Sequence, residues 1–258
     1  MKPETLTVIF TAIAVLASAI PVSAGQDAGM SAAPMPTPMP PPPPESGGLV
    51  DEIGAELTFG YDSIYMFRGV DFGDNLMWSD VNVTLPLVEG LELNAGAWYA
   101  SLAEDDYAEL DLYGGLEYAV TEDFSVGVGY TWYYFARTGD EVDEVGASLT
   151  YSLAGIDFGV NYYYDFETDG SYYEVGASYE IPFTDSIALA PAVTVGFGDD
   201  YYGVSGGNHV GLVLGLPIQL TRSASLTPYI GGNIPNDALD DLGEDDQVYG
   251  GAALTVSF

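Results

Sequence analysis

Carboxylate chemistry dominates what this chain could do. Its 258 residues include 39 Asp and Glu, four Lys and Arg, one His and no Cys, for a formal net charge of -35. Such an acidic chain repels nucleic acid, so that class of partner is excluded. The lack of cysteine excludes disulfides and thiolate metal sites. Because basic residues are few, most carboxylates must bind cations, remain hydrated or take up protons.

One set of polar residues lies on the same one of the two alternating faces of the predicted strands. All of them are close to the longer predicted loops. If their strands face a common lumen, they form a mostly anionic collar near one mouth: Asp80, Glu109, Glu144, Glu174, His209 and Gln247. Rings of carboxylates attract cations and reject anions. The hypothesis is that this collar favours cation conduction or captures divalent ions. The alternative is that the acids only line a wet lumen, screened by salt or paired with Arg68 and Arg137.

Other polar residues also have side chains that could carry out chemistry. Asp62, Asp111 and Asp165 also have inward parity. A barrel phospholipase would hold Ser and His on its lipid-facing rim, whereas His209, the one histidine, has inward parity. A protease at the barrel mouth would need paired acids opposite His209, and nothing in the sequence fixes that geometry. No phosphate-binding glycine loop or metal-ligand spacing is present. We therefore expect no enzymatic activity and no cofactor.

Acidic residues also cluster in the predicted outer loops, at 104–106, 140–141, 199–200 and 237–246. The last of these lacks the alternate-residue ligand spacing of an EF-hand. Weak Ca²⁺ or Mg²⁺ binding, with bridging to lipopolysaccharide, is one interpretation of these loops. A solvated surface that resists aggregation is the other.

The elements that would position these residues are β-strands. From Ile53 to Phe258, apolar and polar residues alternate with a period of two, in segments of roughly 10 residues. Turn residues divide this region into twelve predicted strands, at 53–66, 76–87, 91–101, 107–120, 124–136, 143–153, 156–166, 172–184, 187–198, 208–220, 225–234 and 246–258. Short turns alternate with longer connections at 67–75, 102–106, 137–142, 167–171, 199–207 and 235–245. This arrangement is typical of an all-β fold, a transmembrane antiparallel up-and-down β-barrel of about 12 strands.

The two faces of the predicted strands differ in composition. One face is apolar, without charged residues in its middle, as lipid contact requires. Aromatic residues lie at both ends of these rows, and those near the longer loops are Tyr65, Tyr99, Tyr134, Tyr164 and Tyr173. The other face is acidic and rich in glycine, which leaves room for water or a narrow passage and does not suggest hydrophobic plugging. A soluble β-sandwich is the alternative, but it would need neither two aromatic belts nor one-sided loop lengths.

Three regions are expected along the chain. Residues 1–24 resemble a signal peptide, with Lys2, an apolar stretch and a small-residue cleavage site at 22–24. Residues 25–52 are rich in Pro, Met and Gly and predict a flexible periplasmic tether, or else a peptide ligand for a periplasmic partner. Residues 53–258 form the barrel, located in the bacterial outer membrane after cleavage of the leader.

Short motifs in the barrel region carry a family resemblance. They are Tyr65 to Gly69, Gly96 to Trp98, Tyr107 to Gly114, Glu144 to Gly146 and Tyr162 to Asp165. In order and spacing they resemble the bacterial Gcw_chp family of conserved hypothetical outer-membrane proteins. The resemblance implies a barrel inserted by the outer-membrane assembly machinery, with Phe258 as the recognition residue. It implies no substrate, and the proline-rich tether and the extreme acidity depart from the family pattern.

Two functions follow from these patterns. The leading one is a small outer-membrane pore for cations or small polar solutes, in contact with lipid and lipopolysaccharide. The alternative is a non-conducting surface or anchoring protein that acts through its acidic outer loops. Bulky residues or arginine–acid ladders across the lumen would favour the alternative, and the sequence shows few of either.

Overall fold

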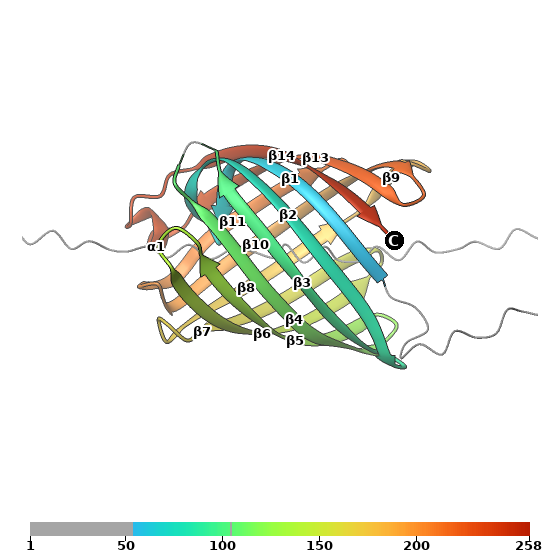
Figure 1. The fold of residues 1–258 in the computed structure, drawn as a ribbon, viewed down its shortest axis with the longest axis horizontal. Coiled ribbons are helices and arrows are strands. Elements are labelled where there is room, and N and C mark those ends of the chain that lie inside the picture. Colours follow the sequence, from blue (N-terminus) through green and yellow to red (C-terminus); the bar gives the residue numbers. More distant parts are fainter. Residues whose placement is uncertain (1–53, 104) are drawn as a thin grey trace, which may run out of the picture.

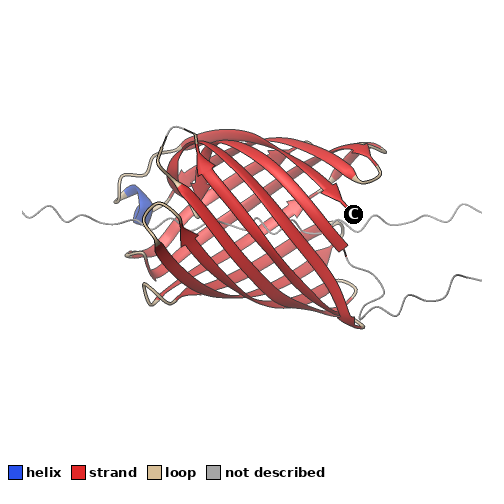
Figure 2. Ribbon diagram, viewed as in Figure 1, coloured by secondary structure: helices blue, strands red, loops and turns tan. Residues whose placement is uncertain are grey.

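The alternating pattern does form a continuous β-structure in the computed structural model, which describes residues 54–103 and 105–258. The predicted signal peptide (1–24) and tether (25–52) lie outside the described residues. The strands, drawn in Figures 1 and 2, are β1 Gly54–Phe67, β2 Val70–Val88, β3 Leu91–Leu102, β4 Ala108–Thr121, β5 Phe124–Phe135, β6 Asp140–Leu153, β7 Ile156–Asp165, β8 Gly170–Tyr179, β9 Ile181–Thr184, β10 Ile187–Tyr201, β11 Val204–Gly215, β12 Ile218–Thr221, β13 Ala224–Pro235 and β14 Gln247–Ser257.

The strands close into one antiparallel barrel of twelve staves, which confirms the predicted fold. Each strand pairs with its neighbours along the chain, and β1 closes the cylinder by pairing with β14. A stave is one of the twelve strand positions around the barrel. The segment pairs β8–β9 and β11–β12 each occupy one stave, interrupted by a break, so that fourteen strands fill twelve positions. Pro217 lies at the break between β11 and β12, and Pro182 lies in β9, two residues after the break at Glu180. Proline lacks the amide that the ladder needs. Nevertheless β13 runs unbroken past Pro228, which pairs with Ala252 of β14.

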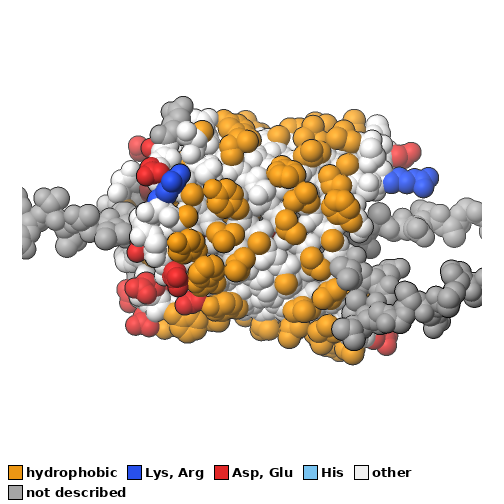
Figure 3. Space-filling view, in the orientation of Figure 1, with side chains coloured by type: hydrophobic (Ala, Val, Ile, Leu, Met, Phe, Trp, Pro, Cys, Tyr) orange, Lys and Arg blue, Asp and Glu red, His pale blue; other side chains and the backbone are white. Residues whose placement is uncertain are grey.

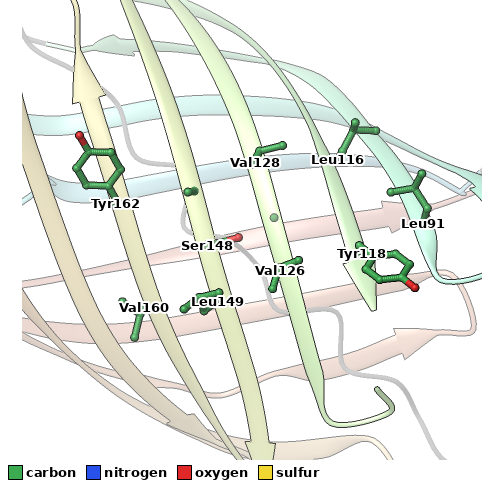
Figure 4. A pocket seen from close by; sticks show the side chains of 11 residues that line it. Leu91, Leu116, Tyr118, Val126, Val128, Ser148, Leu149, Val160 and Tyr162 are labelled. Atoms are coloured by element: carbon green, nitrogen blue, oxygen red, sulfur yellow. The ribbon is translucent and has the colours of Figure 1, made fainter. Parts of the chain in front are cut away.

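The outer wall of the barrel is apolar along its middle. Phe59 and Val128 are 53% and 60% exposed, which is a position that only lipid would favour for such side chains. In Figure 3 apolar side chains cover the belt, while acidic side chains gather mainly at one end. A depression in this wall (Figure 4) is lined by side chains of β3 to β7, among them Leu116, Val126 and Val160. The depression belongs to the lipid-facing surface and not to the lumen.

The helix α1, Asp237–Asp240, lies in the connection between β13 and β14 and marks one end of the barrel, called here the α1 end. The first and last described residues lie at the opposite end (Figure 1), as an even number of staves requires. No helix among the described residues is both long and apolar enough to cross a bilayer.

Two of the longer connections predicted at the α1 end are wrong. Residues 67–75 and 199–207 belong mainly to strands, joined by two-residue turns at Arg68-Gly69 and Tyr202-Gly203. The first turn has φ values of 47° and 85° and the second 50° and 78°. Two successive positive φ angles are the mark of the tight hairpin turn that matches strand twist. The polar residues of these segments concealed the strands, because ladder hydrogen bonds use the backbone and not the side chains.

The predicted position of Tyr65 in the outer aromatic belt is also wrong. The pairing of β1 with β2 shifts register between Ile64 and Met66. Such a bulge reverses which face the following residues occupy. Tyr65 and Phe67 therefore point into the barrel and are almost fully buried.

The inward glycines do not leave the predicted passage, because aromatic rings occupy the space beside them. Gly60 lies opposite Trp78, Gly96 opposite Tyr113, Gly146 opposite Tyr163 and Gly231 opposite Tyr249 on adjacent strands. A Cβ atom added at Gly60, Gly96 or Gly231 would overlap the facing ring, and one at Gly146 would lie 3.2 Å from Tyr163. Glycine is needed here so that a ring can lie flat against the next strand.

Substitution of one such glycine tests this packing. Gly96→Ala places a Cβ 2.5 Å from the Val81 carbonyl oxygen and closer still to the Tyr113 hydroxyl oxygen. We expect the free energy of unfolding in urea to fall by about 1–3 kcal/mol, the usual cost of overpacking. The matched control is Gly159→Ala, an inward glycine with nothing within 4 Å of the added Cβ, which should change it by less than about 0.5 kcal/mol. Equal effects at both positions would contradict the packing argument.

Candidate functional site

The α1 end of the lumen is filled by a cluster of buried side chains, most of them aromatic. Its members come from β1, β2, β3, β5, β6, β8 and β10, namely Tyr65, Phe67, Leu76, Trp98, Ala100, Leu102, Tyr133, Phe135, Val142, Tyr172 and Tyr201. Side chains that faced open water in a pore would be exposed, whereas these are at most 8% exposed. The structure is therefore closed at this end, contrary to the expectation that the lumen lacks hydrophobic plugging.

The tip of the β1–β2 hairpin extends across the lumen to the far wall. Arg68 Nη1 and Nη2 donate to the two carboxylate oxygens of Glu144 on β6, at 2.7 Å and 2.9 Å. Arg68 also donates to the Tyr201 hydroxyl on β10. The side chains of Arg68 and Glu144 are only 4% and 2% exposed. A forked pair of this kind is the strongest arrangement for a guanidinium and a carboxylate.

Aromatic rings surround the same guanidinium. Arg68 Cζ lies 4.2 Å from the ring centre of Tyr163 on β7 and 4.6 Å from that of Tyr172 on β8. The rings of Phe67 and Tyr201 lie at 4.8 Å and 5.0 Å. All four distances fall within the range of cation–π attraction. We call Glu144, Tyr163, Tyr172 and Tyr201 the arginine cage.

Further contacts hold the hairpin in place. The Gly69 carbonyl accepts a hydrogen bond from Asn233 Nδ2 at 3.0 Å, and His209 packs so closely that a Cβ added at Gly69 would lie 2.7 Å from it. In the connection between β13 and β14, Glu244 Oε2 accepts from the Asp71 amide at 3.1 Å. Burial raises the pKa of the Glu244 carboxyl, although the hydrogen bond from the Asp71 amide opposes the shift.

The six residues of the predicted collar do not form an open ring. Glu109 and Glu144 are buried at 0% and 2% exposure, and His209 is buried beneath the hairpin tip. Asp80, Glu174 and Gln247 are partly exposed. A role in ion selectivity stays a prediction for all six, and it applies only to a state in which the hairpin is displaced.

Tyrosine hydroxyls supply the partners that a chain poor in basic residues lacks. Glu109 accepts from Tyr65 at 3.0 Å and from Tyr107, and Asp80 accepts from Tyr113 at 2.9 Å. Glu144 accepts from Tyr133 at 3.1 Å as well as from Arg68. The sequence signal for this network was the count of 20 tyrosines, which the prediction assigned mainly to the outer belts.

The three additional lumen acids lie in different surroundings. Asp62 accepts from Trp78 Nε1 at 3.1 Å and from Tyr229. Asp165 accepts the amides of Glu167 and Thr168 at 2.9 Å and 2.8 Å and thereby shapes the β7–β8 turn. Asp111 is 3% exposed, and its Oδ1 has no hydrogen-bond partner among the described residues.

The opposite half of the lumen is polar and open to solvent. Thr58 and Thr255 share a hydrogen bond at 3.0 Å, and Thr84 donates to Asn94 at 2.8 Å. These side chains and Ser148 are partly exposed. The lumen therefore consists of a hydrated vestibule that is closed at the α1 end by the hairpin and the aromatic cluster.

The structure bears only in part on two further predictions, which are weak binding of divalent cations and the role of Phe258. Within residues 54–103 and 105–258, no group of three or more His, Asp and Glu could hold a metal ion, and we propose no metal site. Phe258 is highly exposed, and its amide donates to the Ala55 carbonyl at 2.9 Å. Its role in assembly stays a prediction, as does the expectation of no enzymatic activity.

Comparison with known proteins identifies the fold. The sequence matches no family model and no curated protein, so the Gcw_chp resemblance stays a prediction. Among solved structures, an outer-membrane channel from Pseudomonas putida F1 is similar with a TM-score of 0.53 and 11% identity, over 84% of this chain and 99% of that one.

The KdgM porin is similar with a TM-score of 0.52 and 10% identity, over 79% of this chain and 99% of that one. A structure of KdgM in complex with disordered oligogalacturonate gives 0.51 and 9% identity, over 80% and 99%. At these identities the likeness establishes an outer-membrane barrel fold and nothing about solute.

Removal of the buried arginine tests the energetics of this site. Arg68→Ala leaves Glu144 charged, buried and without its ion pair, so we expect the free energy of unfolding to fall by about 3–5 kcal/mol. Arg137→Ala is the control, because the Arg137–Asp106 pair at 2.9 Å has side chains that are 56% and 85% exposed; its loss should cost less than about 1 kcal/mol. Urea unfolding in detergent micelles measures both, and a similar small loss for Arg68→Ala would contradict a buried pair.

Proposed function

We propose that this protein is an outer-membrane channel for cations or small polar solutes that its own β1–β2 hairpin closes at rest. The observation that carries this proposal is the contact of Arg68, at the hairpin tip, with Glu144 on the far wall. The closed end is the α1 end, which we assign to the cell exterior, and the hydrated vestibule then opens to the periplasm. The similarity to channel structures in fold supports the proposal.

The hairpin is suited to be a removable plug because its central contact is ionic. Withdrawal of Arg68 into water restores the hydration of the guanidinium, which offsets part of the lost attraction. A plug made only of apolar side chains would have no such compensation. The turn itself has only two residues, so the hairpin would move as one unit.

Cations or neutral solutes suit this lumen better than anions. Asp62, Asp80 and Glu174 line it and are partly exposed, and carboxylates of this kind raise the local concentration of cations. The ligand in the KdgM complex, oligogalacturonate, carries carboxylates that such a lumen would repel. That ligand therefore gives no guide to the solute here.

The second candidate is a barrel that never conducts and acts through its outer surface. The extent of the aromatic cluster favours it, because nine of the cluster's members besides the hairpin's Tyr65 and Phe67 stay on the barrel wall, among them Trp98, Tyr133 and Phe135. These side chains would have to rearrange before a continuous passage formed. The two candidates differ in whether a variant that releases the hairpin conducts.

Planar-bilayer recording of the purified full chain decides between them. We expect the wild type to be mostly closed and Arg68→Ala to show steady single-channel steps, because the hairpin loses its contacts in the arginine cage. Arg137→Ala should behave as the wild type, since its ion pair is on the exposed surface. A silent Arg68→Ala barrel that is folded by heat-modifiable electrophoresis would reject the channel and leave the surface protein.

Selectivity can be measured in the conducting variant. Adding Asp80→Asn and Glu174→Gln to Arg68→Ala removes two lumen charges without touching the most deeply buried acids, so we expect the cation-to-anion permeability ratio to fall at least two-fold. Reversal potentials in a salt gradient give this ratio. Asp123→Asn, at an exposed turn of the opposite end, is the control. An unchanged permeability ratio after Asp80→Asn and Glu174→Gln are added would show that these two acids do not determine selectivity.

A further inference from the structure

We infer that the arginine cage is a binding site for organic cations of the guanidinium class, which Arg68 occupies in the closed barrel as an internal ligand. The inference rests on the proposed closure by the hairpin and specifies the solute that the same site would accept. It follows from the shape of the cage, from the strands that carry it and from the way in which its members are held.

The shape of the cage fits a planar cation. Tyr163 and Tyr172 present their rings to the guanidinium at 4.2 Å and 4.6 Å, and Tyr201 adds a third at 5.0 Å. The rings of Tyr163 and Tyr172 are inclined by 34° with centres 6.2 Å apart, and those of Tyr172 and Tyr201 by 44° at 5.6 Å. Several aromatic faces around one position are how proteins recognise organic cations.

Glu144, the acid of the cage, favours a cation that presents two parallel N–H donors. Both oxygens of Glu144 accept from Arg68, one from each terminal nitrogen. Tyr133 donates to Oε1 at 3.1 Å and Tyr201 to Oε2 at 3.3 Å, which orients the carboxylate. A guanidinium can satisfy both oxygens in one plane, whereas an ammonium is a point charge. A hydrated metal cation would make poor use of the rings.

The cage belongs to the barrel wall and not to the hairpin. Glu144, Tyr163, Tyr172 and Tyr201 lie on β6, β7, β8 and β10, which are consecutive staves. Gly146 and Gly196 leave space for the Tyr163 ring and the Tyr172 hydroxyl on neighbouring strands. Of the groups around the guanidinium, Phe67 is the one that departs with the hairpin. The site therefore stays formed when Arg68 leaves it.

A free ligand must compete with the tethered arginine. A ligand on a short tether acts at an effective concentration of the order of millimolar. We therefore expect wild-type protein to respond only to high concentrations of a guanidinium compound. The Arg68→Ala variant removes the competitor, and it should respond at concentrations at least ten-fold lower.

Methylguanidinium is the probe, added at low millimolar concentrations to the full chain in detergent, with methylammonium and sodium chloride at equal ionic strength for comparison. The expected result is a saturable rise in the thermal midpoint of Arg68→Ala with methylguanidinium, and a smaller rise with methylammonium. Arg137→Ala, in which the cage stays filled, should show no saturable rise. Adding Glu144→Gln to Arg68→Ala should weaken binding at least ten-fold. A response of Arg68→Ala no greater than that of Arg137→Ala would overturn the inference.

A second variant covers the case in which Arg68→Ala fails to fold. Arg68→Lys keeps a positive charge at the hairpin tip but loses the fork, so isothermal calorimetry should detect methylguanidinium binding at lower concentrations than in the wild type. Identical titrations of the two proteins would overturn the inference. Saturable binding in a barrel that never conducts would support this site and reject the channel. Conductance without binding would reject this site and leave the channel standing.

Discussion

The structure depends on one constraint, which is that every backbone amide and carbonyl inside a bilayer must find a partner within the protein. A β-sheet meets this constraint only when it has no edge, and here the pairing of β1 with β14 removes the edge. Closure then divides every strand into a lipid-facing and an inward row. The apolar belt, the even number of staves and the location of both described ends at one side of the barrel all follow from that division.

Closure also creates an interior that the chain must fill or hydrate, and its composition limits how. With four Lys and Arg against 39 Asp and Glu, ion pairs cannot satisfy the inward acids. Tyrosine hydroxyls do so instead, for example at Glu109 and Asp80. The inward glycines accommodate these rings on the neighbouring strands, so glycine and aromatic positions in the lumen form one packing system. As a result the α1 end is closed and the other end is a hydrated vestibule.

Arg68 differs from this pattern, because it satisfies an inward acid by an ion pair. It is a buried basic residue at the tip of a two-residue turn, it reaches a carboxylate on the far wall, and aromatic rings surround it. A buried ion pair contributes little net stability compared with apolar packing, and it is better suited to fix one of two arrangements. The proposals of a hairpin plug and of a site for guanidinium compounds both use this property.

The sequence alone determined the barrel, the strand positions to within a few residues at most ends and the outward rows, because the period-two pattern is local and each lipid-facing row must be apolar. It could not determine the closed lumen. The bulge at Ile64–Met66, which turns Tyr65 inward, and the positive φ angles of Arg68 and Gly69 leave little trace in hydrophobicity. The contact of Arg68 with Glu144 joins residues 76 positions apart. Only closure of the cylinder brings those two strands face to face, so the tertiary structure decided that the mouth is shut.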